Sequence, residues 1–203
     1  MLDGFDQVPF GNLNELRAAV TEETAAILVE PIQGEGGITY AEPEYFKRLR
    51  DTADEFGLLL FLDEVQTGIG RTGKLFAHEW ADIQPDVVAA AKGLGGGFPV
   101  GACLANEKAT AAMAPGTHGS TFGGNPMASA AANAVLDIVL GDGFLENVQK
   151  TGAYLRTKLE ELSAKHAFLG DVRGQGLLTG IVCDDSVVNL DLVKAAENIG
   201  LLT

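Results

Sequence analysis

Two short apolar runs, each ending in a charged side chain, constrain the fold of this chain more than any other feature. The first run, Leu58–Leu62, follows Gly57 and ends in Asp63, and the second, Val87–Ala91, ends in Lys92. Apolar runs of this length between turn residues are typical of strands buried on both faces of a parallel sheet. Because ligands of open α/β sheets bind at the carboxyl ends of the strands, we expect Asp63 and Lys92 to share one binding edge.

A carboxylate and an amine at neighbouring strand ends point to one cofactor. Burying both groups is costly unless they are paired or used. Pyridoxal phosphate needs a lysine for its Schiff base and a carboxylate that keeps its pyridine nitrogen protonated. On spacing alone, Lys92 could equally be a solvent-exposed lysine in a turn. A nucleotide phosphate loop is disfavoured, because Lys92 precedes its glycines whereas Gly-x-x-x-x-Gly-Lys ends in its lysine.

Composition and charge exclude several classes of partner. A net charge of −14 over 203 residues argues against nucleic acid and against an anionic membrane surface. No apolar run approaches the roughly 20 residues of a membrane span, and the acidic N-terminus lacks a signal segment, which predicts a cytoplasmic protein. Cys103 and Cys183 lie in apolar surroundings, so we expect core positions and a reducing compartment. No pattern predicts a metal site.

Hydrophobic periodicity predicts alternating helices and strands. Strand, helix and strand over residues 24–62 form a right-handed parallel crossover. Gly141–Gly143 marks a domain boundary, with residues 1–140 in a large domain and 141–203 in a smaller, incomplete one. Helices are expected at 11–20, 43–56, 127–140, 143–165 and 190–199, strands at 24–29, 58–62 and 87–91, an antiparallel edge strand at 98–105, loop and short helix at 69–86, and a turn with one antiparallel strand at 168–183.

Several motifs together resemble those of the class III pyridoxal-phosphate-dependent aminotransferases, and within them the acetylornithine aminotransferase group. The matching stretches follow the family's order along nearly the whole chain: Val29–Gly37, Asp63–Gly68, Gly70–Gly73, Ala91–Gly97 and His118–Pro126. The resemblance implies an α/β fold, the large domain of a fold type I pyridoxal-phosphate-dependent transferase. That domain has a mostly parallel sheet with helices on both faces, followed here by the start of a small α+β C-terminal domain.

The resemblance also implies roles for residues at the binding edge. Lys92 corresponds to the lysine that forms the Schiff base and moves the substrate proton. Asp63 corresponds to the partner of the pyridine nitrogen. Val65 is expected to pack on one face of the cofactor ring, and Gln66 to hydrogen-bond its phenolic oxygen.

Two further residues receive roles by resemblance alone. Thr121 corresponds to a residue that crosses a homodimer interface to the phosphate of the neighbour's cofactor. Glu35 corresponds to a gate glutamate whose arginine partner lies beyond Thr203, and this gate lets one site accept two substrates. On spacing alone, Glu35 could equally be a solvated loop charge.

The implied reaction moves the distal amine of N2-acetylornithine to 2-oxoglutarate, in arginine biosynthesis. Ornithine, succinylornithine and 4-aminobutyrate are alternative donors. An aminomutase and a non-catalytic or split pyridoxal-phosphate-binding module are alternative functions. Family members carry a further N-terminal half with the main phosphate-binding turn, so we expect this chain to be a fragment with little activity of its own.

Overall fold

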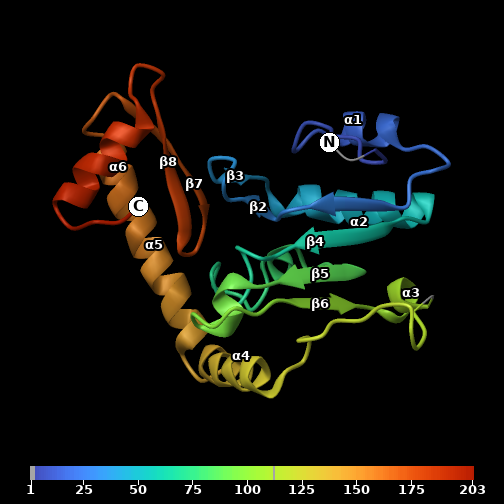
Figure 1. Ribbon diagram of the computed structural model, residues 1–203. Coiled ribbons are helices and arrows are strands. Elements are labelled where there is room, and N and C mark those ends of the chain that lie inside the picture. The colour runs from blue at the N-terminus through green and yellow to red at the C-terminus, as the bar shows by residue number, and fades with distance from the viewer. Residues whose placement is uncertain (1–2, 112) are drawn as a thin grey trace.

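The computed structural model describes residues 3–111 and 113–203 and contains a four-stranded sheet in the order β1-β4-β5-β6 (Figure 1). Its strands are β1 (Ala26–Val29), β4 (Leu59–Asp63), β5 (Val87–Ala90) and β6 (Ala102–Ala105). Strands β1, β4 and β5 are parallel, and β6 runs antiparallel to β5. The two apolar runs are therefore neighbouring parallel strands, and β6 is the predicted antiparallel edge.

Helix α2 (Pro43–Phe56) packs on one face of this sheet and forms the core with it. Pro43 occupies the first turn, and Gly57 ends the helix in the left-handed conformation. The buried side of α2, which includes Leu49, packs with Leu60 and Leu62 of β4. Helix α1 (Leu13–Ala19), capped by the side chain of Asn12, packs in turn on α2.

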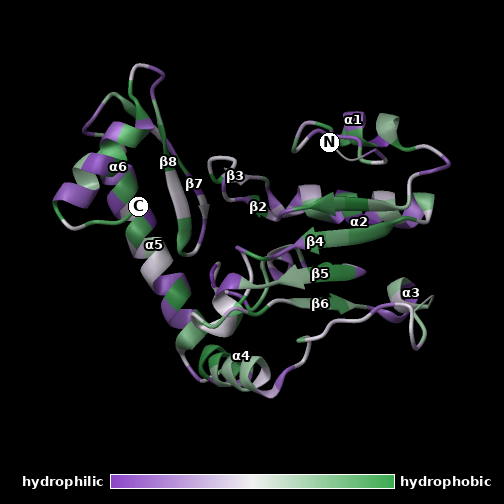
Figure 2. Ribbon diagram, viewed as in Figure 1, coloured by the Kyte–Doolittle hydropathy of each residue, from purple (hydrophilic) through white to green (hydrophobic). Residues whose placement is uncertain are grey.

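The opposite face of the sheet is less covered. Leu28 on β1 is 55% exposed, Phe61 on β4 is half-buried, and Cys103 on β6 is exposed. The predicted burial on both faces and the predicted core position of Cys103 are therefore wrong for the described residues. The reason is the period of two in a strand: α2 covers the side chains of one face, and the alternate side chains point the other way. Figure 2 shows that these strands are nevertheless apolar.

Two hairpins differ from the prediction. β2 (Ile32–Gln33) pairs with β3 (Thr39–Tyr40), where a loop was expected. β7 (Leu169–Gln175) pairs with β8 (Leu178–Cys183), where we predicted a turn and a single strand. The chain reverses here because Gly174 and Gly176 adopt positive φ angles of 101° and 59°, which side chains disfavour.

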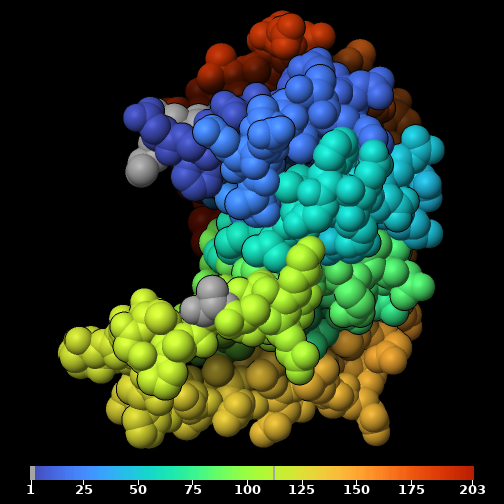
Figure 3. All heavy atoms as spheres, turned by 90° about the vertical axis from the view of Figure 1, so that its right-hand side faces the viewer, coloured from blue at the N-terminus to red at the C-terminus, as the bar shows by residue number. Residues whose placement is uncertain are grey.

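Three further helices begin and end close to their predicted limits: α4 (Pro126–Val139), α5 (Phe144–Ser163) and α6 (Asn189–Asn198). The 3-10 helix η1 (Ala77–Ala81) lies in the segment where a loop and a short helix were expected, whereas the short helix α3 (Glu107–Thr110) and the 3-10 helix η2 (Lys92–Gly95) were not predicted. Asn125 caps α4 by accepting the Ala128 amide at 3.0 Å. Between α3 and α4 the chain projects from the body of the molecule (Figure 3).

Helices α4 and α5 meet at a bend of 69°. No single helix in the described residues has both the length and the apolar character of a membrane span, and these two satisfy that criterion only when taken together across the bend. The predicted boundary at Gly141–Gly143 coincides with this bend. The division into two domains stays a prediction.

The C-terminal hairpin packs on the loop that follows β4. The Leu177 amide donates to the Arg71 carbonyl at 3.0 Å, and the Gln149 side chain of α5 donates to the Gly73 carbonyl at 2.6 Å. Gly176 lies so close to Thr72 that a Cβ at this position would come within 2.5 Å of the Thr72 carbonyl carbon. These contacts connect α5, β7 and β8 to the edge of the sheet where the predicted site lies.

Candidate functional site

Asp63 and Lys92 lie at the same edge of the sheet. Asp63 is the last residue of β4 and pairs with Ala89 of β5. Lys92 follows β5 after one intervening residue and begins η2. Because β4 and β5 are parallel neighbours, both residues stand at the carboxyl ends of adjacent strands, as the sequence predicts.

The backbone of Lys92 has an unusual conformation. Its φ angle is 42°, a region that residues other than glycine rarely occupy and that stores strain. Hydrogen bonds from Leu94 to the Ala91 carbonyl and from Gly96 to the Gly93 carbonyl, at 2.9 and 3.1 Å, hold this turn. Ile38, Ile69 and Asp82 also have positive φ angles, so it is the position of this outlier, after the end of β5 and beside the end of β4, that points to a role for Lys92.

The side chains of Lys92 and Asp63 are less buried than expected. Lys92 is exposed and Asp63 is half-buried. The expectation of a buried ammonium and a buried carboxylate is wrong for the described residues. Asp63 shares the less covered face with Phe61, and Lys92 lies beyond the end of its strand.

A tight turn carries Val65 and Gln66. The Val65 amide donates to Asp63 Oδ1 at 3.0 Å, and the Gly68 amide closes the turn on the Glu64 carbonyl at 2.9 Å. The end of the Gln66 side chain lies directly over the backbone of Gly34, so a Cβ at position 34 would displace it. This contact joins the turn after β4 to the β2–β3 hairpin.

Glu35 lies in that hairpin, next to Gly34, and is exposed. The hairpin is fastened at its base, because the Gly34 amide donates to Glu30 Oε2 at 3.3 Å. Thr121 lies in the loop between α3 and α4 with an exposed side chain. No hydrogen bond links Thr121 to the other predicted site residues within the described part of the chain, and its role stays a prediction.

Sequence reasoning missed Glu64. This side chain is 0% exposed, and its carboxylate accepts hydrogen bonds from the start of η1. The signal was available, because consecutive residues of a strand point to opposite faces. If Asp63 points to the open face, Glu64 must point into the protein.

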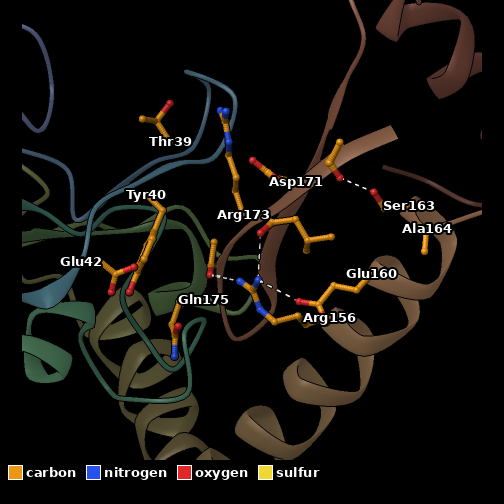
Figure 4. A pocket seen from close by; sticks show the side chains of 13 residues that line it. Thr39, Tyr40, Glu42, Arg156, Glu160, Ser163, Ala164, Asp171, Arg173 and Gln175 are labelled. Carbon is orange, nitrogen blue, oxygen red and sulfur yellow. Dashed lines mark hydrogen bonds and ion pairs between the residues drawn. The ribbon is translucent and has the colours of Figure 1, made fainter. Parts of the chain in front are cut away.

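A polar cavity with a volume of about 1040 Å³ lies away from these residues, between β3, β7 and α5 (Figure 4). None of the six predicted site residues lines it. Arg156 reaches into it, but its guanidinium donates to the carbonyls of Val172 and Gly174 at 3.0 and 2.6 Å. Burial and the charge of Glu42 raise the pKa of Tyr40 in its wall, and the nearby Arg156 opposes this shift. Because both hydrogen bonds of the Arg156 guanidinium go to backbone carbonyls of β7, this side chain supports the β7–β8 hairpin.

The groups at the sheet edge suit pyridoxal phosphate by their chemistry. Asp63 is an acceptor with one oxygen engaged by Val65, Gln66 carries an amide, and Lys92 offers an accessible amine. These groups match a pyridine nitrogen, a phenolic oxygen and an aldehyde, respectively.

Comparison with known proteins decides the family. A family model described as Aminotransferase class-III matches residues 6–203. The chain belongs to the class III aminotransferases. This confirms the predicted family, and the mostly parallel α/β fold agrees with it.

The relatives most similar in sequence include several acetylornithine aminotransferases. The acetylornithine aminotransferase of Brucella melitensis biotype 1 is 54% identical over 203 residues, 100% of this chain and 50% of that protein. The acetylornithine aminotransferase of Caldanaerobacter subterraneus subsp. tengcongensis is 52% identical over 202 residues, 100% of this chain and 51% of that protein. The chain thus spans about half the length of the curated relatives it matches.

Solved aminotransferase structures share the fold. The ornithine delta-aminotransferase of Plasmodium falciparum superimposes with a TM-score of 0.93 at 35% identity, covering 100% of this chain and 53% of that one. The acetylornithine aminotransferase from Elizabethkingia anophelis gives a TM-score of 0.91 at 40% identity, covering 98% and 51%.

Proposed function

We propose that this chain supplies the lysine and the ring-nitrogen carboxylate of a pyridoxal-phosphate-dependent aminotransferase. The observation that carries the proposal is the strained Lys92 at the end of β5, beside the β4 end that carries Asp63. Membership of the class III family supports it.

The cofactor, when bound, supplies an electron sink for breaking the bond between hydrogen and the amine-bearing carbon. The Nζ atom of Lys92 would take up this proton from the substrate carbon as a general base. It would then give the proton to a carbon of the cofactor as a general acid. The Asp63 carboxylate favours a protonated ring nitrogen beside it by charge. Val65 packs on the ring and Gln66 donates to the ring oxygen, so both hold the ring in place against Lys92.

The substrates follow from the relatives. We propose N2-acetylornithine as amine donor and 2-oxoglutarate as acceptor, in a cytoplasmic step of arginine biosynthesis, because relatives more than 50% identical bear the name acetylornithine aminotransferase. Ornithine is the second candidate donor, since ornithine aminotransferases superimpose closely. Succinylornithine and 4-aminobutyrate remain weaker alternatives.

Glu35 and Thr121 complete the proposed site. Glu35 is assigned as the gate that switches between the two substrates, and its exposure leaves it free to move. Thr121 is assigned to the phosphate of a neighbouring subunit's cofactor in a homodimer, which suits its position in a projecting loop. A non-catalytic or split pyridoxal-phosphate-binding module is the alternative, favoured by the exposure of Lys92.

An amine-transfer assay tests the proposal. We expect the full-length protein to form glutamate from 2-oxoglutarate with N2-acetylornithine, with a higher kcat/KM than with ornithine. Lys92→Ala should abolish turnover, whereas Lys194→Ala on the exposed surface of α6 should not. Cofactor binding without glutamate formation would favour the non-catalytic module.

A further inference from the structure

Glu64 is a buried acidic residue that the proposed chemistry does not use. It directly follows the half-buried Asp63, yet its own side chain is 0% exposed. A carboxylate is costly to bury unless hydrogen-bond donors surround it. The number and the origin of its donors therefore indicate what it does.

Both oxygens of Glu64 are engaged by groups from later in the chain. Oε2 accepts from the Thr67 hydroxyl at 2.8 Å and the Ala77 amide at 2.7 Å. Oε1 accepts from the His78 amide at 2.9 Å and lies 2.8 Å from Nδ1 of His78. The hydrogen of this pair is assigned to Nδ1, the arrangement that lets an ionised carboxylate accept. A carboxylate offers about four acceptor positions, so this one is saturated.

The backbone of Glu64 is fixed as well. Its amide donates to the Ala89 carbonyl of β5, and its carbonyl accepts from Gly68, both at 2.9 Å. One residue thus joins the neighbouring strand, the turn 64–68 and the start of η1. Val65 and Gln66 project from this same turn, and the Val65 amide holds Asp63.

We propose that Glu64 is the positioning residue of the cofactor site: it anchors the turn that presents Asp63, Val65 and Gln66. This inference rests on the proposed function for the roles of those three residues. Glu64 itself touches neither cofactor nor substrate and acts through the turn.

The substitution Glu64→Gln tests this anchor with almost no change of volume. The amide nitrogen of glutamine replaces one acceptor oxygen. Thr67 and the His78 ring can adapt by reversing their hydrogen bonds, but a backbone amide cannot. The backbone amide of either Ala77 or His78 then loses its acceptor. A buried donor without an acceptor is the costly case.

Asp86 offers a matched control. It is also a buried carboxylate, 5% exposed, and it accepts from the Leu60 amide, Arg50 and Asn106. It directly precedes β5 and therefore lies at the opposite edge of the sheet from Lys92. Asp86→Asn should lower stability without disturbing the turn after β4.

The experiment combines two readouts on the full-length protein: amide hydrogen exchange, and titration with pyridoxal phosphate followed by visible absorbance. In Glu64→Gln we expect exchange at residues 65–68 and 77–78 to rise roughly tenfold relative to the interior of α5, the change that one lost buried hydrogen bond produces. We expect the cofactor affinity of the folded protein to fall by about the same factor. Asp86→Asn should change neither the exchange at these residues nor the cofactor affinity.

Unchanged exchange and affinity in Glu64→Gln, or the same local changes in Asp86→Asn, would overturn the inference. Local exchange that rises in Glu64→Gln while even the wild type gives no cofactor absorbance would uphold the anchor and count against the proposed function instead.

Discussion

Asp86 shows how a single buried carboxylate ties strand ends to α2. Arg50 of α2 lies 2.7 Å from Asp86 Oδ2, and Asn106 donates to Oδ1 at 2.7 Å. Burial raises the pKa of Asp86, but hydrogen bonds from the Leu60 amide, Arg50 and Asn106 outweigh it, so its pKa lies below the ordinary value. A carboxylate with a depressed pKa contributes stability above its unfolded pKa and loses it as pH falls through its folded pKa.

We therefore expect the free energy of unfolding to fall as pH drops below about 4, near the unfolded pKa of aspartate. Asp86→Asn should cost about 1–3 kcal/mol at neutral pH and remove this part of the acid sensitivity. Urea unfolding at several pH values measures both effects. An equally steep loss in the variant would assign the acid sensitivity to other groups.

The core under α2 should depend on individual side chains. Leu49 is fully buried between α2 and the sheet, so Leu49→Ala should lower the free energy of unfolding by about 2–5 kcal/mol. Leu190→Ala, at an exposed position of α6, should change it by less than about 0.5 kcal/mol. Similar costs for both variants in urea unfolding would contradict the described core.

At the scale of elements, the β2–β3 hairpin is held against β7 and β8 through Ile38. Ile38 has a φ angle of 52°, a strained value for a β-branched residue. A Cβ on Gly180 would lie 2.9 Å from Cγ1 of Ile38, which is too close. A side chain at position 180 would therefore force Ile38 and the β2–β3 hairpin to shift relative to the C-terminal hairpin.

Gly180→Ala should therefore destabilise the protein by about 1–3 kcal/mol through overpacking. Ile38→Ala removes the clashing atoms, so the double variant should recover part of that loss. A double-mutant cycle in urea should show a coupling of at least about 0.5 kcal/mol. Additive effects would mean that the two hairpins are not packed together.

The elements that the sequence predicted well are those set by local patterns. The amphipathic spacing of Phe46 and Leu49, with Pro43 before and Gly57 after, defines α2 without tertiary information. The two-residue strands of the β2–β3 hairpin have no periodicity to detect. Residues 168–183 were predicted as a turn and one strand, because the reversal at Gly174 and Gly176 between two paired strands leaves no clear pattern in the sequence. The exposure of Lys92 could not be predicted, because burial depends on which segments pack over the sheet rather than on the strand itself.

At the scale of the whole molecule, α4 has an exposed apolar side. Met127 is 69% exposed, and Ala130, Ala134 and Ile138 follow it at helical spacing, also exposed. An exposed apolar stripe of this kind indicates an interaction surface. The proposed homodimer, in which Thr121 crosses between subunits, places this helix beside the contact.

We expect the protein to migrate as a dimer in analytical ultracentrifugation and Met127→Glu to shift it toward the monomer. A charge buried in an interface without a partner is strongly unfavourable. Leu190→Glu on α6 serves as the matched control and should leave the dimer intact. If both variants dissociate the dimer, or if neither does, α4 does not form the interface.

The central claim is that Lys92 captures pyridoxal phosphate, and one titration tests it most directly. The full-length wild type and its Lys92→Ala and Lys194→Ala variants are each titrated with pyridoxal phosphate while the visible absorbance of the lysine-linked cofactor is followed. We predict that wild type and Lys194→Ala gain this absorbance and that Lys92→Ala does not. An equal gain in Lys92→Ala, or no gain in the wild type, would contradict the assignment of Lys92.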